Sequence, residues 1–80
     1  MPYFTYVLRS RQNGKLYTGH TENLEARLHQ HNSGMSPYTK NRGPWDLVYF
    51  EEFADRSAAM KRETFLKTGK GREFLKEKLG

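Results

Sequence analysis

The sequence predicts an α+β fold in which helices flank a small three-stranded antiparallel sheet. Two observations support this fold class. Apolar residues alternate with period two in three segments, residues 3–10, 15–20 and 45–53. Residues 22–32 and the segment after residue 55 instead show the spacing typical of amphipathic helices. With 80 residues in total, the chain is expected to form one domain, 1–80.

The composition excludes several classes of protein. Without cysteine, the chain cannot hold a disulfide framework or a zinc cluster of thiolates. It has no apolar run near the ~20 residues that span a bilayer and no signal-peptide pattern, so we expect a cytoplasmic protein without a membrane association. Residues 1–55 hold six basic and six acidic side chains, but residues 56–80 hold eight and three. This basic end suggests a polyanion partner, although from charge alone an ordinary solvated helix surface is the favoured explanation.

The first two strands are expected to form a hairpin, because an Asn-Gly pair separates them. If the loop has an even number of residues, Tyr6 and Tyr17 lie on the same face of the sheet. An odd loop would separate the two tyrosines. Two tyrosines on one face of a sheet more often serve packing than chemistry. Gly19 then interrupts the second strand, either to let a backbone or ligand approach closely or to allow a bend.

A helix is predicted from Glu22 to Asn32, with Thr21 as its N-cap. At about 100° per residue, Arg27 and His31 lie along the edge of its buried stripe. Two interpretations stay open at this point. The pair is part of a functional site, or it is a snorkelling arginine and a core histidine with satisfied hydrogen bonds.

Residues 34–44 resemble a surface loop that offers side chains for contacts with a ligand, namely Thr39, Lys40 and Arg42. In the third strand, alternation places Leu47, Tyr49 and Phe53 on one face.

A second helix is predicted from Asp55 or Ser57 to about Thr68, and a third over residues 72–79. In the second helix, Glu63 falls inside the apolar stripe of Ala59, Met60 and Leu66. A carboxylate in that position needs a cation, a metal or an opening to solvent. A salt bridge to Arg27 or to a lysine is the structural alternative.

These residue types limit the chemistry. The chain has no cysteine nucleophile, no nucleophile-elbow sequence and no phosphate-binding glycine loop. The remaining candidates suit phosphodiester hydrolysis with one Mg²⁺ ion, because Mg²⁺ keeps most of its waters and often needs only one protein carboxylate. Glu63 would be that ligand, and the guanidinium of Arg27 matches phosphate oxygens.

Short motifs in this order and spacing resemble the GIY-YIG nuclease superfamily, especially its small stand-alone bacterial members related to the N-terminal catalytic domain of the UvrC excision-repair nuclease. Phe4-Thr5-Tyr6 stands in place of Gly-Ile-Tyr, and Tyr17-Thr18-Gly19 in place of Tyr-Ile-Gly. The helix motif around Arg27 and His31 and the later Met60-Lys61-Arg62-Glu63 also match. The first motif lacks its glycine and isoleucine, and the second lacks its isoleucine.

The resemblance implies a DNA endonuclease of low sequence specificity that depends on Mg²⁺ or Mn²⁺, with a role in DNA repair or processing. If the family's roles apply, Tyr6 would position or deprotonate the attacking water, and Tyr17 would bind the phosphate or share that role. Arg27 would stabilise the transition state. His31 would relay a proton or orient a tyrosine, Glu63 would hold the metal, and Gly19 and His20 would contact substrate. The alternatives are a nucleic-acid-binding module that needs a protein partner for turnover, and a structural domain with a satisfied polar network.

Overall fold

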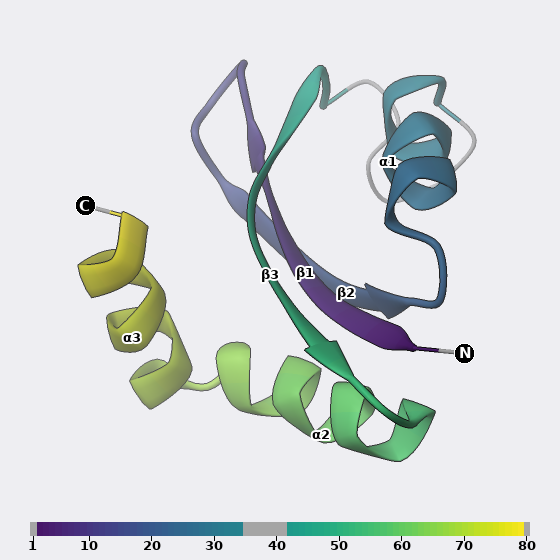
Figure 1. The fold of residues 1–80 in the computed structure, drawn as a ribbon. Coiled ribbons are helices and arrows are strands. Elements are labelled where there is room, and N and C mark those ends of the chain that lie inside the picture. Colours follow the sequence, from purple (N-terminus) through teal and green to yellow (C-terminus); the bar gives the residue numbers. More distant parts are fainter. Residues whose placement is uncertain (1, 35–41, 80) are drawn as a thin grey trace.

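The computed structural model describes residues 2–34 and 42–79 and contains three strands and three helices (Figure 1). Their order along the chain confirms the predicted α+β class. The elements are β1 (Tyr3–Ser10), β2 (Leu16–Thr21), α1 (Leu24–Asn32), β3 (Trp45–Phe53), α2 (Arg56–Leu66) and α3 (Gly69–Leu79). In the described part of the chain, no helix is both long and apolar enough to cross a bilayer.

The strands form an antiparallel sheet in the order β2-β1-β3, so β1 is the central strand. The amide of Ser10 donates to the carbonyl oxygen of Lys15 at 2.9 Å and closes a loop of four residues between them. Gly14 lies in this loop with a φ of +74°, a conformation that glycine adopts without strain. Because the loop is even, Tyr17 pairs with Leu8, which confirms that Tyr6 and Tyr17 share one face.

Helices cover both faces of the sheet, and each face has its own apolar cluster (Figure 1). On the α1 side, the buried residues are Tyr6, Leu8 and Trp45, against which the leucines of α1 pack. On the α2 and α3 side, they are Val7, Leu66 and Leu75. β1 is therefore apolar on both faces because helices cover it on both.

A β-bulge in β3 overturns the predicted faces of that strand. Val7 pairs with Tyr49 but the next residue, Leu8, pairs with Leu47, so Val48 is an additional residue. Leu47 consequently packs on the α1 side, whereas Tyr49 packs on the opposite side. The predicted grouping of Leu47 with Tyr49 and Phe53 was wrong, because simple alternation assumes a strand without a bulge.

The first helix begins two residues later than predicted. Asn23 is its N-cap, and the side-chain oxygen of Asn23 accepts a hydrogen bond from the amide of Ala26 at 3.1 Å. Thr21, the predicted cap, is instead the last residue of β2. Its hydroxyl oxygen accepts a hydrogen bond from the Asn23 amide at 3.1 Å, so Thr21 supports the capping residue.

Two features of the other helices also differ from prediction. Asp55 is the N-cap of α2, which is one of the two predicted alternatives. Met60, predicted to belong to the apolar stripe, is instead 47% exposed and lies outside the buried stripe. α3 begins at Gly69 instead of residue 72, because the hydroxyl of Thr68 accepts a hydrogen bond from the amide of Gly71 at 3.1 Å. Thr68 thus stabilises the first turn of α3 and ends α2 early.

Candidate functional site

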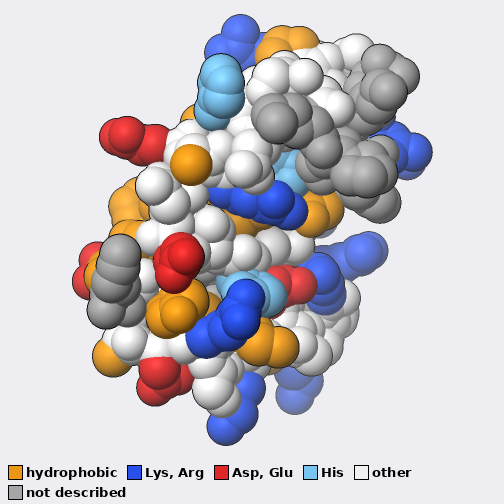
Figure 2. All heavy atoms as spheres, turned by 90° about the vertical axis from the view of Figure 1, so that its right-hand side faces the viewer, with side chains coloured by type: hydrophobic (Ala, Val, Ile, Leu, Met, Phe, Trp, Pro, Cys, Tyr) orange, Lys and Arg blue, Asp and Glu red, His pale blue; other side chains and the backbone are white. Residues whose placement is uncertain are grey.

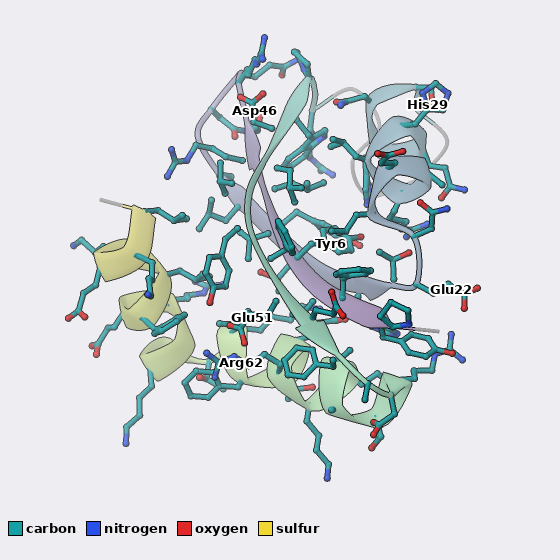
Figure 3. The ribbon with its side chains drawn as sticks, in the orientation of Figure 1. Tyr6, Glu22, His29, Asp46, Glu51 and Arg62 are labelled. Atoms are coloured by element: carbon teal, nitrogen blue, oxygen red, sulfur yellow. The ribbon has the colours of Figure 1, made fainter. Side chains whose placement is uncertain are left out.

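The hydroxyl group of Tyr6 is the centre of a buried polar cluster. Tyr6 points from the central strand towards α1 (Figure 3), and only 2% of it is exposed. Its oxygen lies 2.9 Å from Nε2 of His31 and accepts a hydrogen bond from Nε of Arg27 at 3.3 Å. Arg27 and His31 stand four residues apart on α1, so both side chains reach the same point. The ring of Tyr17 packs against that of His31 at 5.0 Å.

Gly19 leaves the space that the Tyr6 hydroxyl group occupies. The two residues face each other across the β1–β2 ladder. A Cβ atom on residue 19 would lie 2.7 Å from the Tyr6 hydroxyl oxygen and 2.9 Å from the ring carbon that bears it. Real side chains essentially never come so close, so any larger residue would displace the tyrosine. The close approach for which Gly19 is needed is therefore that of the Tyr6 side chain.

His31 and Tyr6 are both neutral near pH 7. Burial, assisted by the positive charge of Arg27, lowers the pKa of His31 to about 4. Burial raises the pKa of Tyr6, although its hydrogen bond from Arg27 opposes this. Because Arg27 only donates, the favoured arrangement has Tyr6 accepting from Arg27 and donating its own proton to the bare Nε2 of His31. The tyrosine proton is thus already directed at a base.

The depressed pKa of His31 predicts a loss of stability in weak acid. The unfolded chain binds a proton at the ordinary histidine pKa of 6.5, but the folded chain only near 4. Protonation therefore favours the unfolded state, and the free energy of unfolding should fall by up to about 3 kcal/mol as the pH falls from 6.5 to 4. Urea titrations across this range measure the fall. His31→Gln should flatten the curve, and the exposed His29→Gln should leave it unchanged.

Glu63 lies on α2, where each of its two carboxylate oxygens faces a nitrogen atom of another side chain. One oxygen is 2.5 Å from Nδ1 of His20, and the other is 2.6 Å from Nζ of Lys67. The side chain is 19% exposed. Burial alone would raise its pKa, but the hydrogen bonds and charges of Lys67 and His20 outweigh burial and lower the pKa of Glu63. The carboxylate is therefore ionised. Of the two predicted salt-bridge partners, Arg27 or a lysine, the described residues show the lysine, Lys67.

The predicted site residues form two groups, one on each face of the sheet. Tyr6, Tyr17, Arg27 and His31 meet on the α1 side. His20 pairs with Thr5, whose hydroxyl bonds to α2, so His20 and Glu63 lie on the α2 side. The negative charge of Glu63 nevertheless acts on Tyr6 and contributes to its raised pKa. In Figure 2, histidine, acidic and basic side chains meet near the middle of one molecular face.

Glu63 could bind a divalent cation if Lys67 left its carboxylate. The described residues contain no group of three or more His, Cys, Asp or Glu side chains suited to a metal. A single ionised carboxylate with water as the other ligands still suits Mg²⁺ or Mn²⁺. Lys67, whose side chain is 53% exposed, would have to leave Glu63. The residues present therefore fit a metal site that has one carboxylate and a displaceable lysine.

Three predicted substrate contacts belong to the segment before β3. Thr39 and Lys40 lie outside the described residues. Arg42 is exposed and lines a groove at the edge of β2. The same groove contains basic residues that the sequence interpretation did not identify, namely Lys15, Lys67 and Arg72. For Lys67, a signal was present, because Glu63 and Lys67 have the i, i+4 spacing of a helix ion pair.

Comparisons with known proteins agree with the observed fold. The model of the GIY-YIG catalytic domain family matches residues 2–77. A UPF0213 protein of Staphylococcus haemolyticus is 44% identical over 75 residues, which cover 92% of this chain and 90% of that protein. Another, from Clostridium perfringens, is 45% identical over 65 residues, covering 80% and 69%. The solution NMR structure of a UPF0213 protein from Bacillus halodurans superposes with a TM-score of 0.58 at 32% identity, covering 96% of this chain and 84% of that one.

Proposed function

The chain belongs to the GIY-YIG catalytic domain family, a nuclease superfamily, and we propose that it is a divalent-metal-dependent endonuclease that hydrolyses phosphodiester bonds in DNA. One observation carries the proposal beyond the family. The Tyr6 hydroxyl is held between a neutral base, His31, and an arginine. A purely apolar core would not need such an arrangement.

The Tyr6–His31 pair supplies a route for the proton of the attacking water. Tyr6 takes a proton from water as it passes its own proton to Nε2 of His31. The water oxygen forms a bond to phosphorus, the bond from phosphorus to the leaving oxygen breaks, and that oxygen takes up a proton from solvent. Removal of one group in such a pair typically costs about 10²- to 10⁴-fold in rate. Tyr17, which is partly exposed, would contact the phosphate beside Tyr6.

Arg27 would stabilise the charge that develops on the phosphate. Its guanidinium bonds to Tyr6 and to the side-chain oxygen of Gln30 at 2.9 Å. Among the described residues, none of the ion pairs includes Arg27, so no carboxylate neutralises its charge there. A partly buried cation without an acidic partner is suited to an anionic ligand.

Glu63 would hold a divalent cation, Mg²⁺ or Mn²⁺, as one ligand among waters. When bound, such a cation neutralises phosphate charge and lowers the pKa of bound water. His20 keeps the carboxylate ionised and oriented. We expect low sequence preference from the catalytic domain itself and a protein partner as the source of any specificity. We also expect a cytoplasmic location and a role in DNA repair or processing.

One observation favours the second candidate function, a nucleic-acid-binding module without turnover. Both oxygens of Glu63 are held by side chains of the protein itself. A metal must compete with Lys67 for the carboxylate, and a strong ion pair would suppress catalysis until a partner displaced it. Exposed ion pairs are typically worth less than about 1 kcal/mol, which favours the enzyme.

Cleavage assays with matched tyrosine variants test the proposed function. Labelled single-stranded, duplex and branched DNA would be incubated with Mg²⁺ or Mn²⁺ and with the native chain, Tyr6→Phe or Tyr49→Phe. The Tyr49 hydroxyl donates to Glu51 at 2.6 Å on the opposite side of the sheet, so this control should keep full activity. Tyr6→Phe should lose about 10²- to 10⁴-fold.

Two results would contradict the proposed enzyme. Equal cleavage by all three proteins would indicate a contaminating nuclease. DNA binding by the native chain without cleavage of any substrate would favour the binding module.

A further inference from the structure

A groove with a volume of about 920 Å³ follows the outer edge of β2. Its walls come from both faces of that strand, with Tyr17 on one side and Thr18 on the other. It continues to the junction of α2 and α3, where Leu66 and Leu75 form its base. β2 is an edge strand of the sheet, with β1 as its neighbour on the other side (Figure 1).

All charged side chains of the described residues that line the groove are basic. Its lining contains four basic side chains, Lys15, Arg42, Lys67 and Arg72, and no acidic side chain among the residues that form it. Lysines scattered over a surface are ordinary, but four cations around one concave surface attract a chain of negative charges. A phosphodiester backbone provides that chain, and Tyr17 places one end of the groove at the candidate catalytic cluster.

Lys67 belongs to two sites at once. Its ammonium group lies 2.6 Å from Glu63, and its side chain also lines the groove. One ammonium group cannot neutralise the carboxylate and bind a backbone phosphate with full strength at the same time. A cation at Glu63 would release Lys67, and a phosphate that holds Lys67 would leave Glu63 available.

We propose that this groove binds the phosphodiester backbone of a nucleic-acid strand and that Lys67 exchanges between Glu63 and a backbone phosphate, which couples metal binding to nucleic-acid binding. This inference rests on the proposed nuclease function and extends it to the path of the substrate. The coupling must be reciprocal, since each ligand changes the affinity for the other by the same factor. Coupling of this kind usually amounts to at least about fivefold.

Binding measurements without metal isolate Lys67. The probe is a fluorescein-labelled single-stranded oligodeoxynucleotide in EDTA, read by anisotropy. Glu63→Gln frees Lys67 and should tighten binding by about fivefold or more. The gain should vanish in the double variant Glu63→Gln/Lys67→Met. Glu73→Gln on α3 removes the same charge from an exposed side chain that takes part in none of the ion pairs of the described residues, and it should change the affinity by less than about twofold.

A second measurement uses the metal alone. Lys67→Met should bind Mn²⁺ more tightly than the native chain, by about fivefold or more in titrations followed by electron paramagnetic resonance. Lys70→Met, an exposed lysine outside the groove lining, is the control and should bind Mn²⁺ like the native chain. Thermal midpoints by circular dichroism confirm that each variant is folded.

Variants of the groove test the path itself. Lys15→Met and Arg72→Met should each reduce the slope of log affinity against log salt concentration by about one, whereas the exposed Lys61→Met should not. Unchanged slopes would overturn the groove, and a gain from Glu63→Gln that persists without Lys67 would overturn the exchange. These assays need no turnover, so their failure is distinguishable from a failure of cleavage.

Discussion

Replacement of Arg27 by glutamine is expected to lower the rate of phosphodiester cleavage by about two to three orders of magnitude, while the fold stays intact. In the proposed mechanism, the loss follows from the removal of a positive charge that would stabilise the phosphate most strongly in the transition state. Tyr6 keeps its contact with His31 at 2.9 Å, so the free energy of unfolding should fall by only about 1 kcal/mol.

The measurement for Arg27 is a single-turnover cleavage rate at saturating protein, combined with urea unfolding. Arg27→Lys keeps the charge but loses the planar guanidinium, and it should recover only part of the rate. Arg56→Gln removes an exposed arginine at the start of α2 and should cleave like the native chain. A full rate for Arg27→Gln would exclude this arginine from the chemistry.

Gly71→Ala is expected to destabilise the fold by about 3 kcal/mol or more. Gly71 is buried where α3 packs on the end of α2. A Cβ atom there would lie 2.5 Å from Cα of Leu66 and would also overlap the carbonyl oxygen of Phe65. Both obstacles belong to the backbone, so no side-chain rotation can relieve the clash.

Gly69 provides a matched control for Gly71 in the same helix. A Cβ atom on residue 69 meets no atom within 4 Å, so Gly69→Ala should leave stability unchanged or raise it slightly. Thermal unfolding of both variants measures the difference. Equal midpoints for Gly69→Ala and Gly71→Ala would mean that α3 does not pack on α2 in this way.

Local sequence signals were sufficient for much of this fold. The Asn-Gly pair predicted the hairpin, and of the two loop parities left open, the even one is observed and places Tyr6 and Tyr17 on one face. Helical spacing likewise placed Arg27 and His31 together. These predictions succeeded because each depends on neighbours within one or two elements.

Contacts between segments far apart in the sequence could not be predicted from local patterns. The bulge at Val48 depends on how β3 pairs with β1, which no pattern within β3 reveals. The packing of Tyr6 over Gly19 needs the register of two strands. The pairing of Glu63 with His20 joins residues 43 positions apart. The contact between His20 and Glu63 therefore became evident only in the folded chain, whereas the helix spacing of Glu63 and Lys67 was visible in the sequence.

The dependence of DNA cleavage on Mg²⁺, compared between the native chain and Glu63→Gln, tests most directly whether this cluster is a metal-dependent nuclease site. The native rate should rise with Mg²⁺ and then saturate, whereas Glu63→Gln should show no cleavage while it still binds DNA. Cleavage by Glu63→Gln at the native rate and with the native Mg²⁺ dependence would contradict the account.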